Sequence, residues 1–545
     1  MDAEAGVAAR ALLPAWRAEP GAIWHHQRAA PVRTADRIVL AALAAAGFVA
    51  LLYLLNWWFR PEHVAQPALF VVLSLVFWYG MSRIAIGWVN ALAIDAPPHR
   101  PAPPGLRVAI FTTSAPGEPL EMIAKTLQAC ARITYPHTTY LLDDTRDPRM
   151  ADAARAAGAV PLVLLDVPGA KAGKINRALA MTSADFILVL DPDHLPFPEF
   201  LDRVLGHFDD ARVGFVQVAQ AYYNQDRSFT AAGAAEQTYA FYGPVQMGLF
   251  GHGASVAIGA NCTFRRGALD SIGGHGIGLA EDLITAIRIH AAGWRSVYVP
   301  EIVSRGLVPE DLGSFYRQQL KWSRGVYEVV FSELLPLARR LTWQQRLSYA
   351  AIGTYYLCGP ATALYLLLPY LYLWTGLQPT HMRFAEFLSR SAPVAALGVG
   401  SYLFIQRWLC DRPREWGLHW RGLVLKIACW PVYLAGTLLA ILRREVRYVP
   451  TAKASVGGRF LALAWPHLLM LVVYALTVSH VIRNRLFVAD DALVFTSEAV
   501  WGMLAFATVP ALAALGALYA AWQSRRPLDT VPWQFVDVKS IGRGR

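Results

Sequence analysis

The chain has 545 residues, of which 55% are hydrophobic and only 16% are charged, and its mean hydropathy is +0.33. Soluble domains are about one quarter charged, so this composition excludes an ordinary soluble protein and also an intrinsically disordered one. Fifty Lys and Arg against 39 Asp and Glu give a net charge of +11. The positive charges flank uncharged runs, which favours a membrane surface over nucleic acid, and we expect no nucleic-acid partner.

Two long uncharged runs lie near the start of the chain. They cover residues 38–59 and 64–82, and the second continues over 84–94 after Arg83. A hydrocarbon core about 30 Å thick needs about 20 apolar residues, so both runs predict membrane-spanning helices. The first run begins too late and is too long for a cleaved signal peptide, and five arginines precede it. The positive-inside rule then places the N-terminus in the cytoplasm and returns the chain there at about residue 95.

Further uncharged or nearly uncharged runs predict four more spans, at residues 347–380, 391–410, 460–482 and 499–524. The uncharged part of residues 419–442 is shorter and contains Pro431, so we expect a helix that lies in the membrane interface. With six spans, the basic residues after this helix and after the last span face the cytoplasm.

The spans divide the chain into four parts. A Pro-rich linker at residues 97–104 leads into about 240 residues without a spanning run, which is the size of one α/β domain. The predicted parts are a cytoplasmic N-terminus with two spans (1–95), a cytoplasmic domain ending in interfacial helices (96–345), four spans with the interfacial helix (346–524), and a cytoplasmic tail (525–545).

The cytoplasmic domain alternates strand and helix patterns. The apolar spacing from Glu118 to Arg132 predicts a helix. This alternation predicts a parallel sheet with helices on its faces, and ligands bind beyond the carboxyl ends of the strands in such sheets. The predicted strands are residues 107–113, 139–142, 160–165 and 186–190.

Two acidic clusters follow strands of this sheet. Asp191, Asp193 and His194 follow the fourth strand in the order Asp-Pro-Asp-His, and Asp143 and Asp144 end a neighbouring strand. Carboxylates two residues apart at a strand end can converge on Mg²⁺ or Mn²⁺, which prefer oxygen ligands. An acidic turn alone more often caps a helix than binds a ligand, and His194 is either a ligand or a hydrogen-bonding neighbour. The metal prediction therefore depends on the other motifs.

In chain order the motifs resemble those of the processive family 2 glycosyltransferases, the cellulose, curdlan, chitin and hyaluronan synthases. The resemblance is specific from Arg107 to Trp322 and weaker as far as Lys453. The cellulose synthase branch is the nearest, because Tyr-Val-Pro-Thr-Ala-Lys at residues 448–453 is similar to its gating loop. The other matching segments are Asp-Asp at 143–144, Lys-Ala-Gly-Lys-Ile-Asn at 171–176, Asp-Pro-Asp-His at 191–194, Arg-Arg at 265–266, Glu-Asp at 281–282 and Gln-Gln-Leu-Lys-Trp at 318–322.

The resemblance implies a GT-A (Rossmann-like) α/β domain on the cytoplasmic side, inserted in an α-helical transmembrane domain. It further implies a UDP-sugar donor whose diphosphate is held with Mg²⁺ or Mn²⁺ at Asp191, Asp193 and His194. Lys171 is equally well explained as a solvated charge at a helix start. The implied nucleotide-sugar contacts are Glu118, Asp143, Asp144, Lys171, Asp191, Gln318, Lys321, Thr451 and Lys453.

Transfer with inversion requires a base that accepts the proton of the acceptor hydroxyl. Asp282, with Glu281 beside it, is the candidate. The pair opens a predicted helix, so a role at the helix N-terminus is the alternative, and both roles can hold. Ala280 replaces the Thr of the family, which removes a hydroxyl contact but not the base.

Gln318, Lys321 and Trp322 are spaced i, i+3 and i+4, which places them on one face of a helix. The resemblance implies that the basic residue binds the leaving diphosphate and that the indole stacks on the terminal sugar of the acceptor. Lys321 replaces an Arg, so the charge is kept but the bidentate geometry is lost. We expect nearby Arg324 to compensate. Trp322 alone is also typical of an interfacial anchor.

The gating-like loop covers about residues 445–458, and its Thr451 and Lys453 are expected to contact the donor phosphates. Pro450 and Ala454 replace Val and Gly of the family and stiffen a loop that has to move. A basic cluster that touches lipid headgroups is the alternative explanation.

Together these features predict an inverting, processive glycosyltransferase in the inner (plasma) membrane, with the lipid bilayer as its surroundings. It would polymerise a UDP-sugar, with UDP-glucose favoured, onto a growing β-linked polysaccharide acceptor and translocate the product. Two alternatives are a non-processive enzyme that adds one sugar to a lipid or other acceptor, and a catalytically silent scaffold or transporter. The resemblance leaves room for a periplasmic or membrane accessory subunit. The short segment after the last span leaves no room for a C-terminal cyclic-di-GMP-binding domain.

Overall fold

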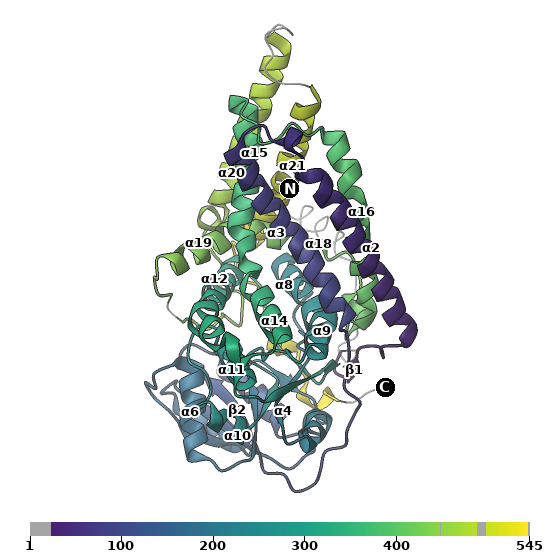
Figure 1. The fold of residues 1–545 in the computed structure, drawn as a ribbon. Helices are drawn as coiled ribbons and strands as arrows, with labels where there is room; N and C mark the ends of the chain where they lie inside the picture. The colour runs from purple at the N-terminus through teal and green to yellow at the C-terminus, as the bar shows by residue number, and fades with distance from the viewer. Residues whose placement is uncertain (1–22, 447, 488–496, 543–545) are drawn as a thin grey trace.

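The computed structural model describes residues 23–446, 448–487 and 497–542. A sheet domain lies at one end of the molecule and a group of long helices at the other (Figure 1). Of the basic residues on which the predicted orientation depends, Arg10, Arg17, Arg447, Arg543 and Arg545 lie outside the described ranges.

The sheet domain is built on a seven-stranded mixed sheet with the order β4-β3-β2-β5-β8-β7-β9. The four predicted strands are present and pair in parallel, as expected. The strands are β2 (Val108–Ser114), β3 (Thr138–Asp143), β4 (Val160–Val163), β5 (Phe186–Leu190), β7 (Val213–Val218), β8 (Cys262–Arg265) and β9 (Arg295–Val299).

The prediction of a wholly parallel sheet is wrong at β8, which pairs antiparallel with both β5 and β7. Between β7 and β8 the chain forms α8 (Phe229–Ala240) and α9 (Gln246–Gly251). The chain then returns to the edge of the sheet at which β7 ends. The register shows this, since Cys262 at the start of β8 pairs with Gln217 near the end of β7. A parallel pair would need a crossover to the opposite edge.

The two acidic clusters do not follow neighbouring strands, which corrects a second expectation. β2 lies between β3, which ends at Asp143, and β5, which precedes Asp191. The chain order runs outward from β2 in both directions, so β2 marks the point where the strand order reverses. The carboxyl ends of the strands form a crevice at such a point, and both acidic clusters lie there.

Alternate residues of the central strands pack into two cores, one on each face of the sheet. Phe111 of β2 packs with Ile175 of α6 (Ala170–Met181) and with Ile287 of α11 (Glu281–Ala291). Ile110 of the same strand packs with the opposite core, which includes Phe200 of α7 (Phe200–Val204). Burial on both faces explains why β2 and β5 are apolar runs without alternation.

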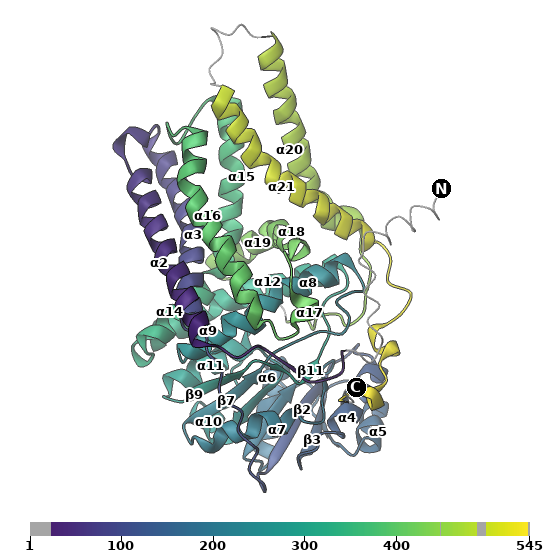
Figure 2. The same cartoon turned by 90° about the vertical axis from the view of Figure 1, so that its right-hand side faces the viewer.

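Among the described residues, six helical segments are long and apolar enough to cross a membrane, and they lie at the six predicted places; the two helices within residues 419–442 pass the same test only when they are taken together as one bent pair. Figure 2 shows α2, α3, α15 and α16 side by side above the sheet domain. Arg83 does not interrupt the second segment, because α3 continues through it to Leu92. The segments are α2 (Thr34–Trp58), α3 (Pro67–Leu92), α14 to α15 (Trp343–Thr375), α16 (Phe384–Ile405), α20 (Phe460–Phe487) and α21 (Ser497–Gln523).

Residues 419–442 form two short helices, α18 (Trp420–Ala428) and α19 (Trp430–Ile441), bent by 46°. Pro431 lies in the first turn of α19, where its missing N–H costs nothing. α19 packs against α12 (Leu312–Val329), and the hydroxyl of Tyr433 donates to Oε1 of Gln319 at 2.9 Å. Its position in the membrane interface stays a prediction.

The segment after α21 returns to the sheet domain. Trp533 is buried against Met122 and Ile123 of α4 (Leu120–Cys130). The ammonium of Lys125 on the same helix donates to the carbonyl oxygen of Val536 at 3.1 Å. The described C-terminal segment is therefore held on the outer side of α4.

Candidate active site

One cavity of about 1300 Å³ joins the crevice at the sheet edge to the long helices. Its walls come from the ends of β2, β3 and β5, from the start of α11, from α12 and α14 (Trp343–Gly353), and from the C-terminal half of α3. The sequence-predicted site residues that line it are Glu118, Asp144, Lys171, Asp191, Asp193, His194, Glu281, Asp282, Gln318, Lys321, Trp322, Thr451 and Lys453.

Asp143 is the one predicted site residue that does not line this cavity. Its buried carboxylate accepts hydrogen bonds from Ser114 Oγ at 2.6 Å and from the backbone N–H and hydroxyl of Thr145, at 3.0 and 2.8 Å. These contacts tie the end of β3 to the end of β2. Of the Asp-Asp pair, only Asp144 faces the cavity.

Lys174 is a site residue that the sequence prediction missed. Its ammonium donates to the carbonyl oxygen of Ser114 at 3.0 Å and lies 3.6 Å from Oδ2 of Asp144. Burial lowers the pKa of Lys174, although Asp144 opposes the shift. The signal was present, because Lys174 follows Lys171 by three residues and shares its face of α6.

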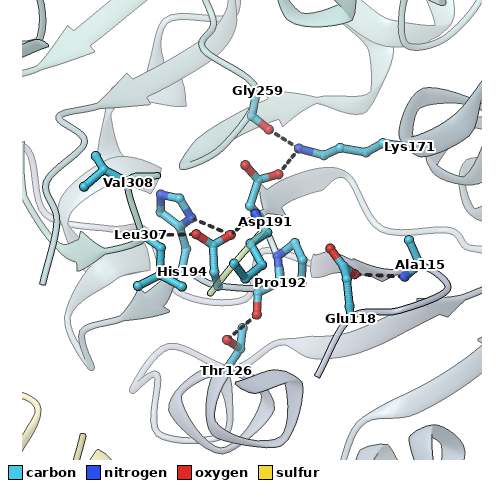
Figure 3. A network of polar contacts seen from close by, with 12 residues as sticks. Ala115, Glu118, Thr126, Lys171, Asp191, Pro192, His194, Gly259, Leu307 and Val308 are labelled. Carbon is cyan, nitrogen blue, oxygen red and sulfur yellow. Dashed lines mark hydrogen bonds and ion pairs between the residues drawn. The ribbon is translucent and has the colours of Figure 1, made fainter. Parts of the chain in front are cut away.

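Asp191, Asp193 and His194 bring their candidate ligand atoms within 4.8 Å of one another. The turn that carries them is fixed from two sides, since Thr126 Oγ1 donates to the carbonyl of Pro192 at 2.7 Å and the Leu307 N–H donates to Oδ2 of Asp193 at 3.0 Å. Figure 3 shows this network from close by.

The donor set fits a divalent cation. Both ring nitrogens of His194 are buried, and among the described residues neither has a hydrogen-bond partner. The ring fits only because residue 306 is glycine; a Cβ there would lie 2.3 Å from Cε1 of His194. The two carboxylates suit Mg²⁺ or Mn²⁺, which prefer oxygen ligands, and His194 offers one nitrogen ligand beside them.

Two lysines neutralise the same carboxylates. The ammonium of Lys171 contacts Asp191 and the carbonyl of Gly259, and Lys453 Nζ lies 2.8 Å from Oδ1 of Asp193. Burial raises the pKa of Asp193, but Lys453 and His194 outweigh it and hold that pKa well below its usual range. Lys171 is therefore buried and paired, which excludes the solvated charge that was the alternative.

Asp282 lies in the first turn of α11 with its Oδ1 accepting the Leu283 N–H at 2.7 Å. Burial and the neighbouring charge of Glu281 raise the pKa of Asp282 to about 7. A Cβ at Gly259 would lie 3.4 Å from Oδ2 of Asp282, so the loop that holds Lys171 also touches this carboxylate. A general base works best with a pKa near the operating pH, and Asp282 meets that condition.

Gln318, Lys321 and Trp322 share the cavity face of α12, as their spacing predicted. The ammonium of Lys321 lies 4.8 Å from the ring centroid of Tyr448 in the gating-like loop. Burial lowers the pKa of Lys321, although Glu281 opposes the shift. Arg324 does not line this cavity, and its Nε donates to the carbonyl of Arg444 instead, so it does not replace the missing guanidinium.

The gating-like loop lies against the metal motif. Tyr448, Pro450, Thr451 and Lys453 line the cavity, and the ammonium of Lys453 points into it rather than toward a lipid surface. Ala454, the next residue, packs in the cluster that includes Trp533. The loop is thus held between the active site and the C-terminal segment.

Comparison with known families agrees with this geometry. Residues 103–325 match the model described as "Glycosyltransferase like family 2", and residues 270–385 match the model described as "Cellulose synthase". The chain is therefore similar to family 2 glycosyltransferases over residues 103–325 and to cellulose synthases over residues 270–385. The described residues form the fold that this resemblance implies, a GT-A domain joined to long helices that are apolar enough to cross a membrane.

Two curated relatives are cellulose synthase catalytic subunits described as UDP-forming. The protein of Komagataeibacter sucrofermentans is 30% identical over 270 residues, which is 48% of this chain and 36% of that protein. The protein of Xanthomonas axonopodis pv. citri is 30% identical over 241 residues, 43% of this chain and 33% of that protein. The matched segment thus spans about a third of each relative.

A solved structure, the mannosyltransferase PcManGT from Pyrobaculum calidifontis in complex with GDP-Man and Mn²⁺, aligns with a TM-score of 0.46 and 17% identity. The alignment covers 70% of this chain and 99% of that one.

Proposed function

We propose that this cellulose synthase-like protein is an inverting, processive transferase that polymerises a UDP-sugar into a β-linked polysaccharide and passes the product through its long helices. UDP-glucose is the first donor to test. The observation that carries the proposal is the single cavity in which the metal motif, Asp282 and Trp322 all lie, and which continues to α3. Two relatives are described as UDP-forming cellulose synthase catalytic subunits, which supports the choice of a UDP-sugar donor.

The donor is held at the carboxyl ends of the strands. Asp144 and Glu118 contact the nucleoside, and Asp191, Asp193 and His194 would hold Mg²⁺ or Mn²⁺. The cation would neutralise the charge of the diphosphate and of the leaving UDP. Lys171 and Lys453, which lie beside the same carboxylates, supply two ammonium groups to the phosphate oxygens.

The acceptor enters from the side of α12. Trp322 stacks on its terminal sugar, and the acceptor hydroxyl attacks C1 of the donor while Asp282 Oδ2 accepts its proton. The new bond joins the acceptor oxygen to C1, the bond from C1 to the β-phosphate oxygen breaks, and UDP leaves from the opposite face with inversion. Lys321 stabilises the negative charge that develops on the diphosphate.

The product leaves along the cavity. Trp322 and Val326 line it at successive turns of α12, Leu347 and Ala351 line it at successive turns of α14, and Tyr355 lines it as well. A hydrophilic polymer cannot cross hydrocarbon unaided, because each buried hydroxyl without a partner costs several kcal/mol. In this proposal the catalytic domain and both termini face the cytoplasm, and the protein resides in the inner membrane.

The test is product analysis with purified full-length protein, radiolabelled UDP-glucose and Mn²⁺ or Mg²⁺. We expect a product of high molecular mass that a β-glycosidase degrades, together with stoichiometric release of UDP. A product in which the acceptor gains one sugar would contradict processive synthesis and support single transfer. Unchanged function in cells that carry Asp282→Asn would support the silent scaffold instead.

A further inference from the structure

The end of the cavity that lies among the long helices contains two cations and no carboxylate. Arg83 of α3 and Lys426 of α18 both line it. Within the part of the chain that the structure describes, neither side chain has an acidic partner. Arg83 donates to the Ala351 carbonyl and the Thr354 hydroxyl, both cations lie over the ring of Tyr355, and Lys426 also hydrogen-bonds to the Tyr355 side chain. The acidic residues lining the cavity belong to the donor end, and they are Glu118, Asp144, Asp191, Asp193, Glu281 and Asp282.

Both cations are grouped around one tyrosine. Arg83 Cζ lies 5.7 Å and Lys426 Nζ 4.7 Å from the ring centroid of Tyr355. Arg83 Nη1 donates to the carbonyl of Ala351 at 2.7 Å, and the Tyr79 hydroxyl, one turn earlier on α3, donates to the Tyr355 carbonyl at 2.8 Å. These bonds fix both the arginine and the tyrosine, so the two positive charges are held together in a defined place.

Such an arrangement is costly unless an anion completes it. Arg83 lies nine residues before the end of α3 at Leu92, or about 14 Å along the helix. Ionisable groups at this depth in a membrane span are expensive, and they usually face a water-filled path and mark a substrate route. Cation–π contacts offset part of the cost, but two like charges on one ring also repel each other.

We propose that Arg83 and Lys426 bind carboxylate groups on the glycan as it leaves the acceptor site, so that the product is an acidic polysaccharide. The inference rests on the proposed function, because it places the growing chain in this cavity. A glycan is favoured over an anionic lipid, since one cavity is lined both by Trp322 at the proposed acceptor site and by Arg83 and Lys426. The carboxylate enters with the donor, so UDP-glucuronic acid joins UDP-glucose as a donor to test.

The test is a binding measurement on the full-length protein in nanodiscs of uncharged phosphatidylcholine. The probes are a β-1,4-linked glucuronic acid oligosaccharide, the glucose oligosaccharide of the same length, and a short-chain prenyl phosphate. By isothermal titration calorimetry we expect the acidic oligosaccharide to bind about tenfold more tightly than the neutral one, with a preference that shrinks as salt is added.

Variants separate charge from structure. Arg83→Gln combined with Lys426→Gln should abolish the preference and leave the affinity for the neutral oligosaccharide within about twofold. The charge-preserving pair Arg83→Lys and Lys426→Arg should retain most of the preference for the acidic oligosaccharide. The matched control is Arg390→Gln in α16. Arg390 lies outside the cavity, with its Cζ 4.8 Å from the ring centroid of Tyr53. This variant should change neither the two affinities nor the preference between the oligosaccharides.

Trp322→Ala distinguishes failure of this inference from failure of the proposed function. If Trp322→Ala weakens both oligosaccharides but the wild type shows no preference for the acidic one, only the anion site is wrong. If Trp322→Ala changes neither affinity, the acceptor site itself is misplaced. Binding of the prenyl phosphate that depends on Arg83 and Lys426, without binding of the acidic oligosaccharide, would overturn the assignment to a glycan.

Discussion

The two ends of the cavity arrange charge in opposite ways. At the donor end Lys171, Lys174 and Lys453 each lie beside a carboxylate, as Lys453 does with Asp193. Around Tyr355 the two cations lie together with no carboxylate beside them in the described structure. Paired charges suit a site where a metal ion and a diphosphate enter and leave, whereas unpaired cations suit a route for an anionic ligand. The contrast is consistent with one cavity that binds the donor at one end and an anionic ligand at the other.

The largest effect should come from the base at the donor end. Asp282→Asn removes the group that accepts the hydroxyl proton, and general bases contribute about 10²- to 10⁴-fold to rate. We expect UDP release from UDP-glucose to fall by that range while UDP binding stays within about threefold. The matched control is Asp152→Asn on an exposed turn of α5 (Pro148–Ala156), where a single ion pair to Arg155 contributes little. Equal losses in both variants would contradict the role of Asp282.

Trp322 lies where the two ends meet, so its removal should affect the acceptor rather than the donor. Stacking of a sugar on an indole buries apolar surface worth about 1.5–3 kcal/mol, so Trp322→Ala should lose at least about tenfold in acceptor affinity. Product length should shorten, measured by gel filtration of labelled polymer, and Trp322→Phe should recover part of it. An unchanged product length would limit Trp322 to the role of a membrane-interface anchor.

The pH dependence of the rate tests whether the ionisation of Asp282 controls catalysis at the donor end. Asp282 must be deprotonated to act, and its pKa is raised to about 7, so kcat/KM should fall about tenfold per pH unit below 7. Glu281 contributes to that raised pKa. Glu281→Gln should therefore move the acid limb to lower pH by about one unit. An acid limb that stays in place, in profiles of UDP release from pH 5 to 9, would show that another group controls the rate.

The smallest effect concerns the lysine that covers the metal motif. Lys453 competes with a cation for Asp193, because the two groups are 2.8 Å apart. Lys453→Gln should tighten Mn²⁺ binding several-fold, to about tenfold, in the absence of donor, while UDP release falls. Electron paramagnetic resonance of free Mn²⁺ measures this directly. Weaker Mn²⁺ binding in the variant would mean that Lys453 does not occupy the cation's place.

Much of the fold was predictable because its signals are local. Uncharged runs long enough to cross a bilayer marked all six long helices, and apolar strands ending in acidic residues marked the sheet edge. The direction of β8 was not predictable, because it depends on where the chain returns after α8 and α9. The place of β2 between β3 and β5 is likewise a tertiary property that no single strand encodes.

The candidate site also has residues that the sequence could predict and residues that it could not. Motif order predicted which side chains share one cavity, except that Asp143 is used to join β2 to β3. Lys174 could have been found from its spacing to Lys171. The grouping of Arg83 with Lys426 could not, because these residues lie on helices far apart in the sequence and meet only through Tyr355.

The most direct test of the account is a cryo-electron microscopy structure of the protein after turnover with donor and Mn²⁺. The account predicts saccharide density that begins against Trp322, beside Asp282, and continues through the cavity to Tyr355. Density that leaves the acceptor site toward the cytoplasm, with the space between Trp322 and Tyr355 filled by side chains or lipid, would contradict it.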